Sequence, residues 1–248
     1  MKKFNYENKI YLEKLNDLKL SYYSKYIKYI KKNLPEKSST FLDVGCGNGT
    51  VLKQLNNKGY NKGYGAEISK LFIKATKSKG IDKVFLYDGI RLPFKNDFFD
   101  LIGSFNVLEH TQNPEMFLKE EINKLKNKGI LIIACPNFLS VLFPSNNRRL
   151  RGVKNKLRNL FLIFRKILKK QEGFEKMPPV IAKKFEYDDD AIVVTNMIDL
   201  KYILRKNNCT IIYESGFINY DSVLFEIINM IPFIKYALPS CFIVAQKN

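Results

Sequence analysis

The sequence predicts an α/β protein in which a mostly parallel sheet carries helices on both faces. Short apolar runs alternate with amphipathic stretches between residues 40 and 137, which is typical of βαβ units with right-handed crossovers. A glycine-rich turn follows the first apolar run directly. The length of 248 residues and the 46% hydrophobic content suit one domain with a full core.

The elements follow one another regularly as far as residue 137. Strands are predicted at 40–44, 64–67, 83–87, 99–105 and 129–134, and helices between them at 51–55, 71–75 and 116–122. After a break, the pattern resumes with a helix at 197–208 and strands at 209–215 and 241–246. The connection between these last two strands contains the apolar stretch 223–231.

We interpret the whole chain, 1–248, as a single domain with two additions. Residues 1–38 hold amphipathic stretches and form a helical cover. Residues 39–138 and 185–248 form the α/β core, and residues 139–184 form a basic insertion. Within the insertion, apolar residues recur at helical spacing between Lys and Arg from Leu157 to Leu168, which predicts a basic amphipathic helix.

The net charge of +18 is concentrated in two places. Residues 1–40 hold ten Lys or Arg against four Asp or Glu, and residues 145–184 hold thirteen against two. Such clusters indicate an acidic partner: nucleic acid, an anionic membrane surface or a phosphorylated substrate. A Lys-rich composition that only keeps the protein soluble explains the charge equally well.

Cysteine usage and the N-terminal sequence predict a cytoplasmic protein. The four cysteines are far apart and the chain has one histidine, so a structural zinc site is not expected. Dispersed cysteines suit a reducing compartment. We expect neither a signal peptide nor a membrane-spanning segment, because no apolar h-region and no run of about 18 apolar residues occurs.

The loop after the first strand predicts a nucleotide-like ligand. It reads Asp43-Val44-Gly45-Cys46-Gly47-Asn48-Gly49 and stands between a strand and a helix. Glycines there let a ligand approach the backbone closely, since they have no Cβ and turn sharply.

Two carboxylates follow at the ends of the next two strands. Glu67 comes 20 residues after Gly47, where a carboxylate can accept hydrogen bonds from ribose hydroxyls. Asp88 is followed by Gly89, and this pair suits the edge of an adenine ring. The G-x-G-x-x-G spacing of dinucleotide-binding proteins is absent because Thr50 stands where its third glycine would be, which disfavours the alternative of an NAD(P)-binding oxidoreductase.

Residues 38–137 resemble the class I S-adenosylmethionine-dependent methyltransferases. The similarity rests on residues 41–49, Gly65-Ala66-Glu67-Ile68-Ser69, Tyr87-Asp88-Gly89, and residues 92–94, 98–102, 107–110 and 132–137. Within this family the sequence resembles the ubiquinone/menaquinone-biosynthesis-type subgroup, which acts on small molecules and lipids. The resemblance implies a Rossmann-like seven-stranded sheet whose last strand is antiparallel.

The resemblance also implies the cofactor, S-adenosyl-L-methionine, with S-adenosyl-L-homocysteine as product. In this interpretation the loop residues flank the methionine moiety, Glu67 with Ile68 the ribose, and Asp88 with Gly89 the adenine. Phe105 and Asn106, after the fourth strand, are expected at the methionine moiety. The loop residues are Asp43, Gly45, Cys46, Gly47, Asn48 and Gly49.

The residues predicted to be catalytic are Glu109 and His110, of which His110 suits a general base. A packing or capping role for His110 remains the alternative. Some relatives bind a divalent metal with Glu-x-x-Glu-His here, but Asn106 replaces the first glutamate, so no metal is predicted.

The acceptor is expected to be a small molecule, a saccharide or a lipid-linked molecule, and an anionic one. No N/D-P-P-Y motif follows the fourth strand, so nucleic acid is disfavoured. The basic insertion either packs its apolar face on the core as a lid, the commoner arrangement, or lies peripherally on an anionic membrane. A non-catalytic module that binds polyanions or membranes and retains this fold is the remaining alternative.

Overall fold

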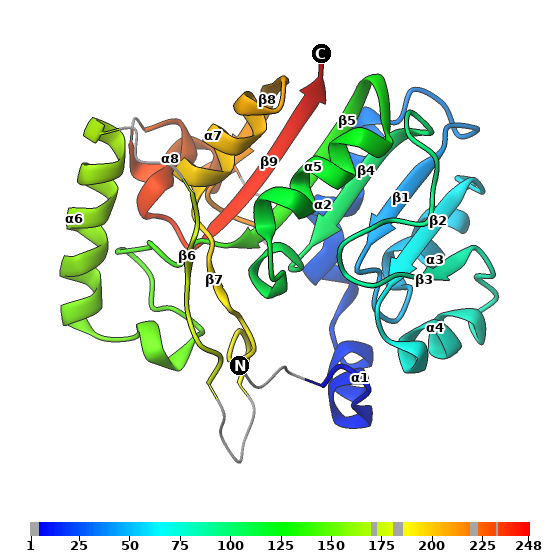
Figure 1. Ribbon diagram of the computed structural model, residues 1–248, viewed down its shortest axis with the longest axis horizontal. Helices are drawn as coiled ribbons and strands as arrows, with labels where there is room; N and C mark the ends of the chain where they lie inside the picture. The colour runs from blue at the N-terminus through cyan, green and yellow to red at the C-terminus, as the bar shows by residue number, and fades with distance from the viewer. Residues whose placement is uncertain (1–4, 170–172, 181–185, 219–222, 232) are drawn as a thin grey trace.

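Seven strands form one sheet in the order β3-β2-β1-β4-β5-β9-β8 (Figure 1). The computed structural model describes residues 5–169, 173–180, 186–218, 223–231 and 233–248. The strands are β1 (Phe41–Val44), β2 (Gly63–Glu67), β3 (Val84–Leu86), β4 (Phe99–Phe105), β5 (Leu125–Pro136), β8 (Cys209–Ser215) and β9 (Ser240–Lys247). Strands β1 to β5 pair in parallel, whereas β9 pairs antiparallel with both β5 and β8. The predicted seven-stranded sheet with an antiparallel last strand is confirmed.

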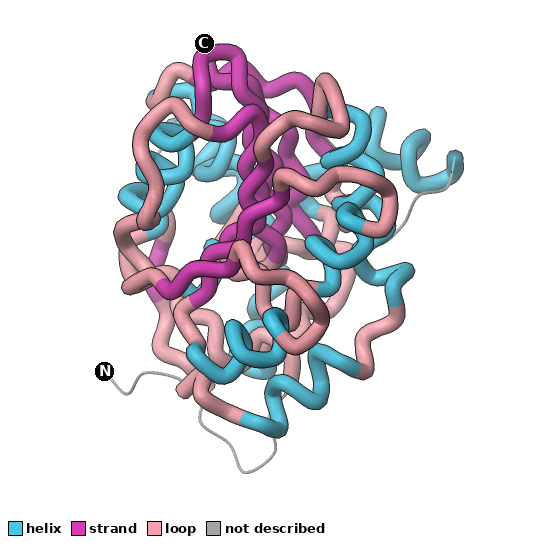
Figure 2. The backbone as a smooth tube through the Cα atoms, turned by 90° about the vertical axis from the view of Figure 1, so that its right-hand side faces the viewer, coloured by secondary structure: helices cyan, strands magenta, loops and turns pink. Residues whose placement is uncertain are grey.

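Alternation along the central strands creates a core on each face of the sheet. Phe41, Leu101 and Ile132 point to one face, where they pack with α2 (Ser24–Asn33) and α3 (Thr50–Asn56). Their neighbours Leu42 and Ile102 point to the other face, which α5 (Pro114–Lys124) and α7 (Met197–Lys206) cover. Figure 2 shows the strands between these layers of helices. Helix α4 (Lys70–Lys77) packs beside β2 and β3 at one end of the sheet.

The first described residues lie across the carboxyl edge of the parallel strands. This segment contains α1 (Lys9–Asn16) and the short 3-10 helix η1 (Leu20–Tyr23), which leads into α2. Helix α1 lies near α4 at the edge where β1 and β2 end (Figure 1). The loops after β1, β2 and β4 are therefore partly covered by residues far away in the sequence.

The insertion builds a small core of its own beside α7. Its elements are the 3-10 helix η3 (Arg148–Leu150), α6 (Val153–Lys169) and the strand β6 (Glu175–Lys176), which pairs antiparallel with β7 (Val193–Val194). Leu162 and Ile163 of α6 pack there against Phe138 and Leu139. Helix α8 (Val223–Met230) and the 3-10 helix η4 (Ile234–Ala237) complete the part of the fold that the structure describes.

Most element boundaries agree with those predicted from the sequence to within a few residues. The small sheet of β6 and β7 was not predicted, because two-residue strands carry no periodicity. The insertion's last residues, 181–184, fall outside the described ranges. Of the two alternatives for the insertion, the one in which the apolar stripe of α6 packs on the core is wrong, since Leu157, Phe161 and Phe164 are exposed.

Candidate active site

The glycine loop between β1 and α3 turns sharply at the carboxyl edge of the sheet. Gly45 has a φ of 68°, and a Cβ there would collide with Val107 of the loop after β4. Gly47 has a φ of 53°, and a Cβ there would lie 3.4 Å from Leu15 of α1. Both positions favour glycine because L side chains rarely adopt positive φ. The loop backbone is thus held against the loop after β4 and against the N-terminal segment.

The loop's polar residues are already engaged within the protein. The Asn48 side chain accepts from Thr50 N, which begins α3, and donates to Asn16 Oδ1 of α1 at 2.9 Å. Gly47 O accepts from the Thr76 hydroxyl of α4 at 2.9 Å. Cys46 is buried, and burial raises the pKa of its thiol well above the ordinary value. These three residues set the shape of the loop.

Glu67 joins the end of β2 to the glycine loop. Its Oε2 accepts from Gly47 N at 2.9 Å, and its Oε1 accepts from Ile68 N at 2.8 Å and Ser69 N at 3.1 Å. Burial raises the pKa of Glu67 despite these three bonds. Because a carboxylate has about four acceptor positions, one remains for an incoming hydroxyl. The structure thereby brings Gly47 and Glu67 together, as the sequence predicted.

Asp88 and Gly89 lie on the neighbouring edge, after β3. The Asp88 side chain is exposed, and its Oδ1 accepts from Arg91 N at 2.7 Å and Ile90 N at 2.8 Å, which lowers its pKa. Gly89 has a φ of 83°, and a Cβ there would meet only Ile68, at 3.8 Å. The exposed side chain of Ile68 and the open face of Gly89 thus lie side by side, an arrangement that suits a flat ring.

Asp43 lies within the buried strand β1 and contacts an aromatic cluster. Tyr26 of α2 donates its hydroxyl to Asp43 Oδ1 at 3.1 Å, and Gly103 of β4 makes room for that ring. Burial raises the pKa of Asp43 to about 7, although the Tyr26 hydrogen bond opposes this. Phe105, which ends β4, packs against Tyr26 with ring centroids 5.2 Å apart. Sequence reasoning missed Tyr26.

Asn106 directly follows β4 in a left-handed conformation, with a φ of 54°. Its Nδ2 donates to the Tyr22 hydroxyl of η1 at 2.7 Å, and its backbone N–H bonds Ala134 O of β5 at 2.7 Å. The Tyr22 ring also meets Phe105 edge-on, with centroids 5.3 Å apart. Phe105 and Asn106 therefore form the floor beneath the N-terminal cover.

His110 lies among carboxylates in the short 3-10 helix η2 (Leu108–His110) after β4. Its Nδ1 is 3.4 Å from Asp190 Oδ2, and its Nε2 is 3.7 Å from Glu109 Oε1. Burial lowers the pKa of His110, but Asp190, Glu109 and Asp188 together raise it above the ordinary value. The imidazole is 14% exposed.

Glu109 is fully buried beside this imidazole. Neither of its carboxyl oxygens has a hydrogen-bond partner among the described residues, and burial raises its pKa well above the ordinary value. Its backbone carbonyl accepts from Ile192 N at 2.9 Å, which holds the chain after the insertion against η2. Burial also raises the pKa of Asp188, to about 6.

The N-terminal segment closes over this constellation from the glycine loop to His110. Glu7 accepts from the first backbone N–H groups of α4, Lys70 N at 2.6 Å and Leu71 N at 3.0 Å. The Tyr6 hydroxyl donates to Asp190 Oδ2 at 3.1 Å, and its ring meets His110 edge-on, with centroids 6.1 Å apart. The cover thus contacts both the predicted cofactor side and the predicted catalytic side.

The sequence predicted His110 and Glu109 but not their partners from distant segments. Asp188 and Asp190 belong to an acidic run, Asp188-Asp189-Asp190, that follows the basic insertion. That run of three carboxylates was the available signal. Tyr6 carried no signal, because an aromatic residue near the start of a chain has many possible packing partners.

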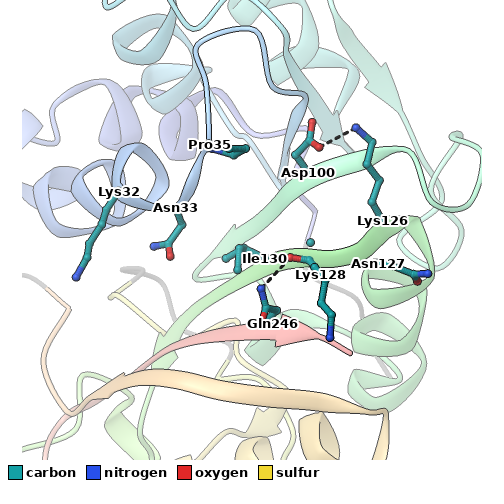
Figure 3. Close-up of a pocket in the computed structure, with 10 residues that line it drawn as sticks. Lys32, Asn33, Pro35, Asp100, Lys126, Asn127, Lys128, Ile130 and Gln246 are labelled. Carbon is teal, nitrogen blue, oxygen red and sulfur yellow. Dashed lines mark hydrogen bonds and ion pairs between the residues drawn. The ribbon is translucent and has the colours of Figure 1, made fainter.

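A shallow hollow lies at the opposite, amino edge of the sheet (Figure 3). It is lined by Lys32 and Asn33 at the end of α2, and by Asp100 and Lys126 at the starts of β4 and β5. Asp100 and Lys126 pair with each other at 2.7 Å. Ligands of open α/β sheets bind at the carboxyl ends of the strands, so this hollow is not the candidate site.

Comparison with known proteins assigns the core of the chain to a family. Residues 42–133 match the family described as a methyltransferase domain. An uncharacterized protein of Methanocaldococcus jannaschii is 29% identical over 203 residues, which is 79% of this chain and 72% of that protein. A ubiquinone biosynthesis O-methyltransferase of Rickettsia bellii is 27% identical over 130 residues, which is 51% of this chain and 53% of that enzyme. The chain thus spans about half the length of that enzyme.

Solved structures show the same fold over nearly the whole chain. A putative methyltransferase of Haloferax volcanii, solved in complex with the Trm112 methyltransferase activator, superposes with a TM-score of 0.60 and 14% identity over 97% of this chain and 95% of its own. An S-adenosylmethionine-dependent methyltransferase of Mesorhizobium loti superposes with the same TM-score and identity, over 89% of this chain and 96% of its own. At this identity the likeness establishes the fold.

The sheet, its glycine loop and the carboxylate after β2 define a nucleoside-binding α/β enzyme. Residues 42–133 form a methyltransferase domain of the class I S-adenosylmethionine-dependent type, whose cofactor is S-adenosyl-L-methionine. The residues present fit that group. Gly45 and Gly47 offer backbone without a Cβ, Glu67 keeps one acceptor position for a hydroxyl, and Ile68 and Gly89 leave a surface for a flat ring.

No helix in the described part of the chain is both long and apolar enough to cross a membrane.

Proposed function

We propose that this methyltransferase acts on a protonated nucleophile of an anionic acceptor, which is a small molecule, a saccharide or a lipid-linked molecule. The observation that carries the proposal is the position of His110 between Asp190 and Glu109, close to the end of β4. When bound, S-adenosylmethionine supplies a methyl group activated by its sulfonium. A base is needed only where the attacking group must lose a proton, as a hydroxyl or an ammonium must.

His110 is the base in this proposal. Asp190 Oδ2 lies 3.4 Å from Nδ1 without forming a hydrogen bond, and its charge favours the tautomer with the proton on that nitrogen, so that Nε2 keeps its lone pair. Nε2 then accepts the proton that the nucleophile loses as it bonds to the methyl carbon. Burial raises the pKa of Glu109 beside Nε2 well above its ordinary value, which disfavours a second full negative charge next to an anionic acceptor.

The cofactor side of the proposal assigns each residue a binding role. Glu67 accepts a ribose hydroxyl, Asp88 and Gly89 flank the adenine, and the loop from Asp43 to Gly49 flanks the methionine moiety with Phe105 and Asn106. Tyr22 and Tyr26 support those two residues from above. The N-terminal cover excludes water from this edge, as a displacement reaction requires.

Charge supports an anionic acceptor. The stretch 145–184 holds thirteen Lys or Arg against two Asp or Glu. It is joined to the loop beside His110, because Arg148 pairs with Asp189 at 2.5 Å and Arg151 pairs with Glu186 at 2.8 Å. Positive potential along this side raises the local concentration of an anionic substrate.

A labelling experiment tests the proposal. The protein is incubated with methyl-labelled S-adenosylmethionine and a total lipid and metabolite extract, and the organic and aqueous phases are counted. We expect label in an anionic product, and a rate about 10² to 10⁴ times lower with His110→Ala. Label in no phase, or label on a cationic product only, would refute the acceptor class. Full transfer by His110→Ala would refute the base.

A further inference from the structure

Helix α6 carries a continuous apolar stripe that points away from the protein. Seven apolar side chains along it are 37% to 74% exposed: Val153, Leu157, Leu160, Phe161, Phe164, Ile167 and Leu168. At 100° per residue they fall within one sector about 120° wide. Large apolar side chains on soluble surfaces are ordinarily scattered, so a stripe of this kind marks an interaction surface.

The helix is fixed to the protein through its opposite face, which is partly polar. Asn159 Nδ2 donates to Phe138 O at 2.9 Å and to Ser140 O at 3.2 Å. Lys166 Nζ forms a buried ion pair with Asp199 of α7 at 2.9 Å. Leu162 and Ile163 complete this face. These specific bonds hold the stripe outward, because rotating the helix would break the buried pair.

The charges beside the stripe are all positive. The sequence 153–169 contains no Asp or Glu. Lys154 borders the stripe on one side and Lys156 on the other, about 100° and 60° from Val153 on the helical wheel. In the described part of the chain neither has an ion-pair partner, whereas Arg158 pairs with Glu175 at 3.0 Å.

We propose that α6 lies along the surface of a membrane rich in anionic lipids and inserts its apolar stripe among the headgroups and upper acyl chains. An apolar sector flanked by free lysines is the pattern of a helix that lies in the interface plane. A second copy of the chain is a poor partner, because two such cationic surfaces would repel each other. Helix α8 stands at the same end of the molecule (Figure 1), and Met230 and Phe233 there are exposed as well.

The apolar stripe of α6 belongs to an insertion that is joined to the loop beside His110. Arg148 and Arg151, just before α6, hold the loop that contains Asp189, and Asp190 in that loop faces His110. A membrane bound by α6 therefore lies next to the side on which the acceptor is expected. The inference does not depend on the proposed function, since lipid binding is measured without cofactor or acceptor.

Vesicle sedimentation with the full chain tests the proposal. We expect binding to vesicles of phosphatidylcholine with about a third phosphatidylglycerol, weakening with salt and much weaker for phosphatidylcholine alone. The double variant Phe161→Ser/Phe164→Ser should lose about 100-fold in affinity. Lys154→Glu/Lys156→Glu should lose about 30-fold, on anionic vesicles only. The matched control is Met116→Ser, which removes an exposed apolar side chain of α5.

Three outcomes would overturn the proposal. The first is absence of binding to anionic vesicles at low salt. The second is unchanged binding by Phe161→Ser/Phe164→Ser. The third is a dimer in light scattering that this variant abolishes while lipid binding is absent, which would assign the stripe to a second copy. Retained binding of S-adenosylhomocysteine and an unchanged Tm show that each variant is folded, so failure here leaves the methyltransferase assignment standing.

Discussion

At the scale of single residues, burial and neighbouring charges set the pKa values of the carboxyl groups and the imidazole in the site. Glu109 and Asp43 are buried and their pKa values are raised, whereas Asp190 faces the imidazole of His110. A charged form is disfavoured by burial and favoured by an opposite charge nearby. His110 therefore lies in surroundings that stabilise the imidazolium formed when it accepts a proton, and it must release that proton before the next transfer.

His110 is the only histidine in the chain, so its titration can be followed directly by NMR. We predict a pKa above the ordinary value of 6.5, because the nearby carboxylates outweigh burial. Asp190→Asn should lower that pKa and move the rising limb of the rate–pH profile to lower pH. The matched control Asp97→Asn, far from η2, should leave it unchanged. A pKa that does not respond to Asp190→Asn would contradict the pairing.

Asp43 makes stability depend on pH in the opposite direction from an ordinary ion-paired aspartate. Its pKa is about 7 in the folded chain and about 4 in an unfolded one, so the folded state binds the proton more tightly. Its contribution to stability is complete below about pH 4 and declines as the pH rises toward 7, by about 4 kcal/mol in total. Asp43→Asn should remove that decline in urea unfolding followed between pH 4 and 8. An unchanged slope in the variant would show that Asp43 ionises normally.

At the scale of elements, the N-terminal segment decides how closed the site is. Glu7 bonds the first turn of α4, where two carboxylate–backbone contacts act as a helix cap. Loss of such a cap costs about 1 kcal/mol, which corresponds to about five-fold in an equilibrium. We therefore expect loss of the two Glu7 contacts to shift the equilibrium of the cover toward an open form by about that factor.

Glu7→Ala should speed the release of S-adenosylhomocysteine about five-fold in stopped-flow measurements. The matched control is Glu13→Ala, which removes an exposed acid of α1. Equal release rates for the two variants would mean that the cover does not gate the cofactor.

The attachment of α6 depends on its buried ion pair. Lys166→Ala leaves Asp199 buried without its cation, which should lower the free energy of unfolding by about 3 to 5 kcal/mol. The exposed Lys154→Ala should change it by less than about 0.5 kcal/mol. Urea denaturation compares the two, and a small effect of Lys166→Ala would show that other contacts fix the helix.

The periodicity of α6 predicted the helix but not its orientation. An apolar stripe is expected to face a core, yet here Asn159 and Lys166 on the other side make the buried contacts. Their partners, Phe138 O and Asp199, lie outside α6, and no pattern in the sequence of the helix predicts them. Polar residues that bind distant segments can thus decide which face of a helix is buried, against the expectation from hydrophobicity alone.

At the scale of the whole molecule, the sheet order explains why the cofactor side was predictable. Strands β1, β2 and β3 are neighbours in space as well as in sequence, so residues at their ends, such as Gly47 and Glu67, meet at one edge. The partners of His110 come instead from Tyr6 and Asp190, which are 184 residues apart in the chain. Only the assembled fold brings them together.

The most direct test of the account is calorimetric titration of the chain with S-adenosylhomocysteine. We predict saturable binding with one site, no binding of NADH, and an affinity at least about 10-fold lower for Glu67→Ala, which loses a charged hydrogen-bond acceptor. Asp97→Ala, at an exposed aspartate far from this edge, serves as the control. Unchanged affinity in folded Glu67→Ala, or competition by NADH, would contradict the assignment of this edge of the sheet to the adenosyl cofactor.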